Sequence, residues 1–188
     1  MRTIRKHYWV GGLVIVALAG LAVGLLRPTP LAGPWRAQIV DAETGQPLEG
    51  VIVLALWDKR SFGWPHPDRN YHDIDEVVSD KDGRIVIPAR DTSGRHPFEK
   101  IIGPLVTVFK PGYANWRFQS TPEGSVKANW ERFAREGVVI VVPRAKTRDE
   151  RLHMLSLVLP GMEVPIEKIP RALAAYNQES IHLGLQPR

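Results

Sequence analysis

The longest stretch of the chain without a charged residue lies near its N-terminus. Residues 10–26 read VGGLVIVALAGLAVGLL. A helix rises about 1.5 Å per residue, so this stretch would span about 26 Å, close to the thickness of a bilayer core. We therefore predict a transmembrane helix over 10–26, which ends at Arg27-Pro28.

The charges beside this stretch predict its orientation. Arg2, Arg5 and Lys6 precede it, and basic residues stay on the cytoplasmic side of a membrane. A cleaved signal peptide is the alternative, but its apolar region usually has about 7–15 residues and ends at a small-residue cleavage site. We favour an uncleaved signal anchor in the inner membrane. The C-terminal domain would then lie in the periplasm or outside the cell.

The basic excess belongs to the N-terminal segment. The formal net charge is +5, yet residues 1–36 contain basic residues and no acidic residue, and 37–188 is balanced. A nucleic-acid-binding protein needs its basic excess on the folded surface, so we predict no nucleic-acid partner. The chain has no cysteine, which excludes disulfides, a thiol nucleophile and cysteine-based metal sites.

Residues after 34 have the pattern of a mainly β protein. Glycine and proline number 16 each, which favours a turn-rich architecture. Short apolar or alternating runs joined mostly by turns predict an antiparallel seven-stranded sandwich rather than a parallel α/β sheet. The predicted strands are 35–41, 51–57, 74–79, 84–88, 105–109, 113–119 and 138–142.

Other segments complete the predicted organisation. We expect a β-hairpin over 74–88 and a long polar loop over 58–73. Helix-forming residues predict a helical insertion near 120–137 and two helices, over 149–159 and 169–183. The predicted parts are a basic cytoplasmic N-terminus (1–9), the anchor (10–26), a Pro-rich linker (27–34), the sandwich (35–143) and a helical C-terminal extension (144–188).

Three segments resemble a known family. Ile39 to Val53 (IVDAETGQPLEGVIV), Val78 to Ile85 (VSDKDGRI) and Phe109 to Tyr113 (FKPGY) are similar, in this order, to motifs of the carboxypeptidase regulatory-like domain, a transthyretin-like (prealbumin-like) sandwich. The resemblance covers about 35–119, with 138–142 closing the fold. It implies a seven-stranded Greek-key-like sandwich and no activity, because such domains usually act as accessory, adhesive or assembly modules.

The segment 64–75 reads WPHPDRNYHDID and contains two histidines and three aspartates. Its imidazole and carboxylate groups, from His66, Asp68, His72 and Asp73, are metal ligands in many proteins, and long loops often carry function. The simpler reading is a polar crossover with solvated charges. Loop spacing alone sets no coordination geometry, so these four residues are only weak candidates for a metal or small-ligand site.

A second possible site is His96-Pro-Phe-Glu99. It has the H-x-x-E spacing of a zinc motif, but a catalytic zinc site needs a third protein ligand on a rigid scaffold. A hydrolase using His96 and Glu99 is therefore the weakest alternative. We predict no catalytic residues and no cofactor.

Together these features predict a membrane-anchored, non-catalytic β-sandwich. Its expected role is structural or in protein interaction, as part of an envelope complex with other envelope proteins. A metal-binding or small-ligand-binding protein is the second hypothesis.

Overall fold

The computed structural model describes residues 31–61, 68–94, 96, 98–114, 116–117, 137–160 and 164–188. The chain divides into two units, Met1–Pro30 and Leu31–Arg188, and all described residues belong to the second. Its elements are β1 (Leu31–Ala32), β2 (Trp35–Asp41), β3 (Ile52–Ser61), β4 (Asp68–Val78), β5 (Arg84–Ile87), β6 (Arg90–Asp91), β7 (Glu99–Phe109), β8 (Trp116–Arg117), β9 (Val138–Val142), α3 (Arg148–Val158), η1 (Ile166–Lys168) and α4 (Pro170–His182).

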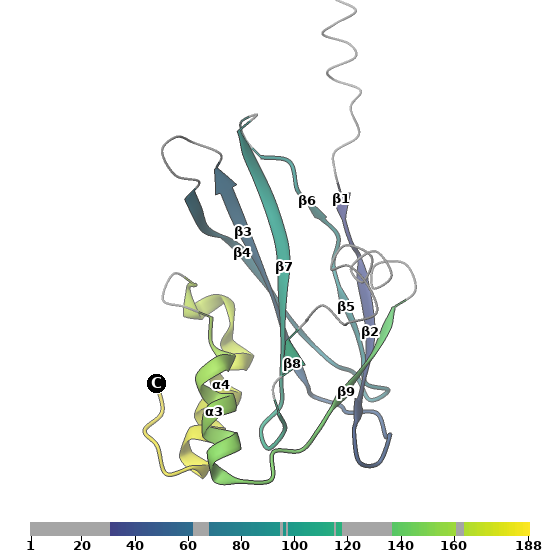
Figure 1. Cartoon of the computed structure of the whole chain (residues 1–188), viewed down its shortest axis with the longest axis vertical. Coiled ribbons are helices and arrows are strands. Elements are labelled where there is room, and N and C mark those ends of the chain that lie inside the picture. Colours follow the sequence, from purple (N-terminus) through teal and green to yellow (C-terminus); the bar gives the residue numbers. More distant parts are fainter. Residues whose placement is uncertain are drawn as a thin grey trace, which may run out of the picture. The chain divides into compact units, whose positions relative to one another are not determined.

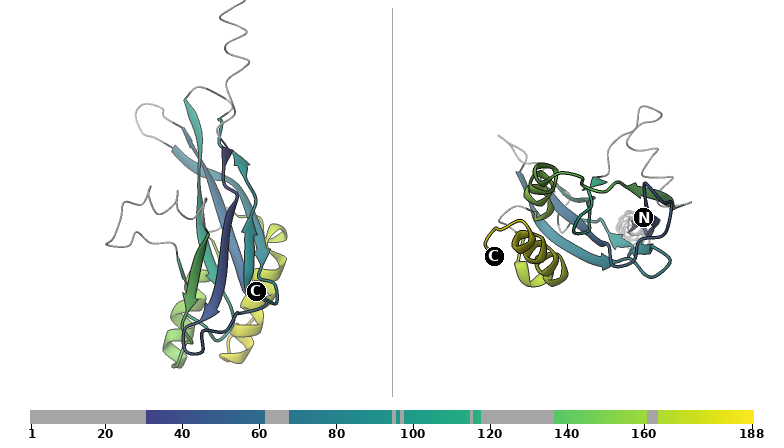
Figure 2. Two further views of the ribbon diagram at one scale, coloured as in Figure 1. Left: turned by 90° about the vertical axis from the view of Figure 1, so that its right-hand side faces the viewer. Right: turned by 90° about the horizontal axis from the view of Figure 1, so that it is seen from below.

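The described strands form three sheets, so the prediction of a mainly β protein is confirmed. Four strands lie in the order β4-β3-β7-β8, three in the order β5-β2-β9, and β1 pairs with β6. The two larger sheets face each other (Figures 1 and 2). Buried side chains from β2, β3, β5, β7 and β9 form one shared core cluster between them.

Alternation along β2 explains how the three-stranded sheet faces this core. Trp35, Ala37 and Ile39 are buried, whereas the residues between them are exposed or half-buried. Side chains of a strand point alternately to its two faces, so one face of β2 contributes to the core. Trp35 meets Trp57 of the other sheet, with ring centroids 5.4 Å apart.

Helices α3 and α4 cover the other face of the four-stranded sheet. Ile52 and Leu54 of β3 and Phe109 of β7 form a second buried cluster with apolar residues of the helices, among them Leu155 and Ala172. The right-hand view of Figure 2 shows the helices on the side of this sheet away from the three-stranded sheet. The first part of β3, Ile52 to Trp57, is buried on both faces and is continuously apolar, as in other two-sided strands. Both predicted C-terminal helices are confirmed.

An ion pair joins the two helices. The guanidinium of Arg151 on α3 donates from Nη2 to Oε2 of Glu179 on α4 over 2.7 Å, and from Nε to Oε1. Only 4% of the Glu179 side chain is exposed. A buried carboxylate needs such a partner because water no longer solvates it.

The predicted polar loop over 58–73 is wrong. β3 continues to Ser61 and β4 begins at Asp68, so much of this segment is strand. The pairing passes from Trp57–Asp73 to Asp58–Tyr71, which makes His72 the extra residue of a β-bulge. These strand segments contain many polar residues, because this part of the sheet is more exposed to water. The sequence pattern therefore did not predict them as strands.

The predicted hairpin over 74–88 is also wrong. The turn at Asp80–Gly83 exists, and the Gly83 amide donates to the Asp80 carbonyl over 2.9 Å. However, β4 pairs with β3 and β5 pairs with β2. The turn therefore carries the chain from one large sheet to the other, and a local turn signal does not reveal which partner each strand finds.

Two further observations, a strand direction and an element boundary, differ from the prediction. β9 pairs with β2 in parallel, so the sandwich is not wholly antiparallel. Leu31 and Ala32 of the predicted linker form β1 and pair with Asp91 and Arg90.

Among the described residues, no helix has the length and apolar character needed to cross a membrane. The predicted anchor at 10–26 lies outside those residues, and so does the predicted insertion up to residue 136.

Candidate functional site

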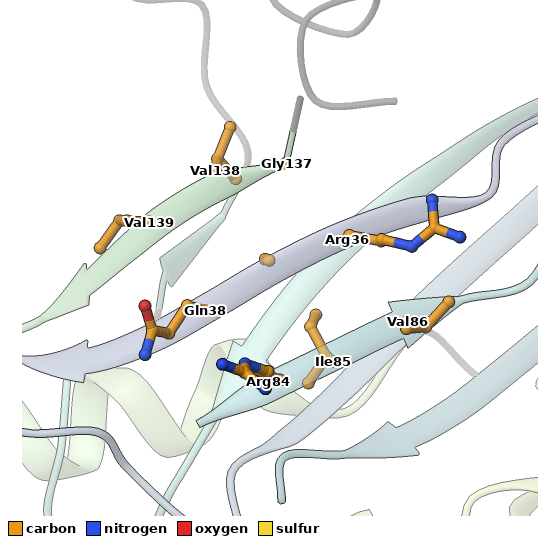
Figure 3. Close-up of a pocket in the computed structure, with 9 residues that line it drawn as sticks. Arg36, Gln38, Arg84, Ile85, Val86, Gly137, Val138 and Val139 are labelled. Carbon is orange, nitrogen blue, oxygen red and sulfur yellow. The ribbon is translucent and has the colours of Figure 1, made fainter. Parts of the chain in front are cut away.

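A groove of about 360 Å³ lies on the outer face of the three-stranded sheet. All three strands contribute to it, together with Gly137 just before β9. Its lining residues are Arg36, Ala37, Gln38, Arg84, Ile85, Val86, Gly137, Val138 and Val139. Figure 3 shows Arg36 and Gln38 along β2, with Arg84 and Val86 on one side and Val139 on the other.

Strand register explains why these side chains share a face. Arg36 pairs with Val86, and Gln38 pairs with both Arg84 and Val139. Directly paired residues point to the same side of a sheet. The inward residues between them fill the core, so the remaining positions form the outer surface.

Exposed valines make this surface partly apolar. Val139 is 62% exposed, Val141 51% and Val86 50%. One exposed valine is ordinary, but several on one sheet face beside a groove are typical of an interaction surface. Arg36 and Arg84 add positive charge, and the described residues that line the groove include no carboxylate.

Sequence reasoning missed this groove. The run Val138–Val142 is wholly apolar, which by itself suggests burial on both faces. The available signal was the alternation in Arg36-Ala-Gln38 and the position of Arg84 beside the apolar Ile85, which places polar groups on one side of two strands. Their adjacency could not be read from sequence, because the register was unknown.

A buried carboxylate holds the end of the same sheet together. Asp41 is 2% exposed, and its Oδ1 accepts hydrogen bonds from the amides of Glu43 and Thr44 over 2.8 and 3.0 Å. Its Oδ2 accepts from the Tyr113 hydroxyl and from Nε of Arg144, each over 2.9 Å. The carboxylate thus links the turn after β2 to the segments beside β7 and β9.

These partners determine the ionisation of Asp41. Burial by itself would raise the pKa of this carboxyl, but the hydrogen bonds from Tyr113, from the two turn amides and from Arg144 outweigh it. They hold the pKa of Asp41 well below its usual range. Both oxygens of this carboxylate accept hydrogen bonds from these donors, so the cluster stabilises the fold.

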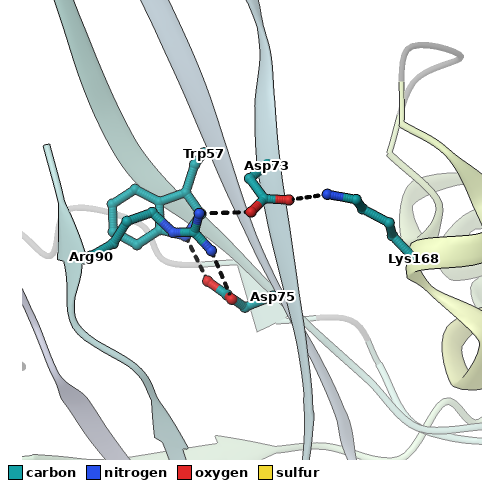
Figure 4. A network of polar contacts seen from close by, with 5 residues as sticks. All are labelled: Trp57, Asp73, Asp75, Arg90 and Lys168. Carbon is teal, nitrogen blue, oxygen red and sulfur yellow. Dashed lines mark hydrogen bonds and ion pairs between the residues drawn. The ribbon is translucent and has the colours of Figure 1, made fainter. Parts of the chain in front are cut away.

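A second polar network lies on β4, within the segment predicted as a functional loop (Figure 4). Nη1 of Arg90 donates to Asp73 over 2.7 Å, and Nη2 donates to Asp75 over 2.9 Å. Asp75 also accepts from Nε1 of Trp57 over 2.8 Å. Lys168 of η1 donates to the other oxygen of Asp73, which ties the helical region to the sheet.

Electrostatics make this network a stable ionic contact. Burial opposes ionisation of Asp73, but the hydrogen bonds from Lys168 and Arg90 dominate and lower the pKa of Asp73 below its usual range. The guanidinium of Arg90 also lies over the Trp57 ring, 5.3 Å from its centroid. Both oxygens of Asp73 therefore already bind cationic side chains.

The structure does not bring the predicted metal candidates together within its described part. His72 is exposed at the bulge, and Asp73 binds Arg90 and Lys168. His66 and the Asp68 side chain lie outside the described residues. Among those described, no group of three His, Asp or Glu side chains could hold a metal ion. The metal-site hypothesis stays a prediction.

His96 lies in the turn before β7, and Glu99 is the first residue of that strand. The Glu99 amide donates to the His96 carbonyl over 2.9 Å. His96 is exposed, and the Glu99 carboxylate lies 3.6 Å from Lys59 on the neighbouring strand. A turn followed by an ion pair accounts for both residues, and the hydrolase hypothesis stays untested.

Comparison with known proteins does not identify a family for this chain. No family model matches the chain, and no curated protein matches it. Among solved structures, a streptococcal ancillary pilin is similar, with 12% sequence identity and a TM-score of 0.27. The match covers 61% of this chain and 30% of the pilin chain, so this chain is similar to less than a third of that protein.

Proposed function

We propose that this protein is a membrane-anchored, non-catalytic β-sandwich that binds another envelope protein through the outer face of its β5-β2-β9 sheet. The observation that carries the proposal is the contrast between the two sheets. Helices bury the outer face of one, whereas the other presents a groove, exposed valines and two arginines. Such a surface is suited to recognition, and its described lining residues include no nucleophile and no general base.

The location of the protein is part of the same proposal. The uncharged stretch 10–26 and the preceding Arg2, Arg5 and Lys6 support a single-pass anchor in the inner membrane, with the sandwich in the periplasm or outside the cell. Sodium carbonate extraction should leave the full-length protein in the membrane pellet. Recovery in the soluble fraction would disprove the anchor.

We further propose that the sandwich belongs with the carboxypeptidase regulatory-like domains, as a seven-stranded Greek-key-like fold. The turn between β2 and β3 supports this relationship. Asp41 accepts from two turn amides, and Gly45 has a φ of 69°, which an L-residue adopts at a cost. The motif residues therefore stand where their conformational properties are needed.

Site-specific crosslinking in cells tests the interaction. A photo-reactive amino acid at Val139 would report what contacts the groove, and the same residue at Ile181 is the matched control. Ile181 is 64% exposed but lies on α4. We expect one discrete crosslinked envelope protein from position 139 and none from 181. Equal patterns from both positions, or no product from 139, would overturn the proposal.

A further inference from the structure

We infer that the groove binds an extended segment with carboxylates at alternate positions and apolar side chains beside them. This inference rests on the proposed function and adds the chemistry of the partner. It follows from three properties of the described residues: the spacing of two arginines, the charge of the lining, and the exposed valines of β9.

The spacing of the arginines favours an extended partner. Arg36 lies opposite Val86, while Arg84 lies opposite Gln38. The positions of the two arginines are therefore separated by a step of two residues along the strand direction. That step is about 7 Å, and an extended segment places its own same-side residues at the same interval. In Figure 3 the guanidinium groups of the two arginines lie apart from each other, which suits two separate carboxylates better than one small anion.

The charge of the lining favours an acidic partner over a second copy of this chain. Arg84 is 69% exposed in its side chain, and its contact with Asp82 is 3.7 Å long. Within the described part of the chain, no carboxylate lines the groove. Two copies that met through this face would bring arginine-bearing patches together, and like charges across an interface oppose association.

The exposed valines of β9 add an apolar contribution. Val139 and Val141 are both more than half exposed, and they would pack against the apolar side chains of a segment that lies along this face of the sheet. The arginines would select a partner segment that carries carboxylates, and the valines would supply the apolar area that is buried on binding.

Peptide binding tests this chemistry with a defined probe. A fluorescent heptapeptide of alternating Val and Glu, with Val-Lys and Val-Ser counterparts, is titrated against the full-length protein in detergent. We expect the Glu peptide to bind best, with weaker binding at high salt. Undetectable binding of the Glu peptide, or equal binding of all three, would overturn the inference.

Charge reversal identifies the residues responsible. Arg36→Glu/Arg84→Glu should weaken binding of the Glu peptide by at least about tenfold, because repulsion replaces attraction. Arg36→Lys/Arg84→Lys should retain most of the binding. Arg171→Glu, at an exposed position on α4, is the matched control and should leave it unchanged. An equal loss in the Arg171 variant would also contradict the inference.

Crosslinking from position 139 separates the two proposals. If the partner crosslink persists undiminished in Arg36→Glu/Arg84→Glu, the groove binds a protein without using carboxylates, and only this inference fails. If no intermolecular product forms, the proposed function fails as well. An intramolecular crosslink to residues 118–136 would mean that the chain fills its own groove, which would overturn both.

Discussion

The outer faces of the two large sheets differ in what lies against them. The face of β4-β3-β7-β8 carries α3 and α4, whereas the face of β5-β2-β9 presents a groove and exposed side chains. Yet β3 and β9 both have apolar runs, and only β3 is buried on both sides. A continuous apolar strand therefore indicates either two-sided burial or a face that is exposed to solvent, and only the neighbouring elements distinguish these.

The largest expected effect on the free energy of unfolding comes from truncating one apolar side chain on each of the two faces. Leu54 is 3% exposed beneath the helices, whereas Val141 is 51% exposed on the other sheet. Leu54→Ala should lower the free energy of unfolding by about 2–5 kcal/mol, and Val141→Ala should change it by less than about 0.5 kcal/mol. Urea unfolding measures both.

A similar loss of unfolding free energy in the two variants would contradict the difference between the two sheet faces. A large loss in Val141→Ala would mean that the supposedly open face is packed in solution. A small loss in Leu54→Ala would mean that the helices contribute little to the sheet they cover.

The next effect tests the pairing of the covering helices. Arg151→Ala would leave Glu179, 3% exposed, without its cation. Removing one partner of a buried ion pair costs about 3 kcal/mol, measured as a lower urea midpoint. Arg171→Ala on the exposed side of α4 should have little effect, and an equal loss there would show that the pair is not responsible.

A smaller effect concerns the turn that carries the chain between the sheets. Gly83 has a φ of 71°, and a Cβ atom there would lie 2.4 Å from the Ile39 carbonyl oxygen. Gly83→Ala should cost more than the about 1–2 kcal/mol of a left-handed residue alone. Gly45→Ala has a similar φ of 69° but no atom within 4 Å, so thermal unfolding should show a smaller loss in this control.

The smallest expected change is in the pH dependence of stability. The pKa of Asp41 is lowered on folding, so its ionised form stabilises the protein above about pH 4, and this contribution is lost as the pH falls further. Asp41→Asn should therefore show a flatter fall in melting temperature on acidification. Glu49→Gln, at an exposed position, should keep the wild-type slope, and an unchanged slope in Asp41→Asn would contradict this role.

Much of the β character was predictable from local sequence. Alternation predicted β2 at its observed bounds, and turn residues located the bends at Gly45 and Gly83. Helix formers predicted α3 and α4. These features depend on contacts between residues close in the chain, where propensity and periodicity act directly.

Prediction failed where pairing between distant segments decided the outcome. Residues 74–88 have a hairpin pattern, yet their two strands join different sheets. The metal-site hypothesis stays a prediction, but the ion pairs of its candidate Asp73 with Arg90 and Lys168 were not foreseen. Neither cation is near Asp73 in sequence, so no local pattern could place it there.

The sequence by itself determined an apolar N-terminal stretch, a turn-rich β body without cysteine, and two C-terminal helices. Only the tertiary structure decided which sheet those helices cover and which face they leave open to solvent. The physical reason is that periodicity sets which side chains share a face of a strand, whereas burial of that face depends on elements brought together from distant parts of the chain.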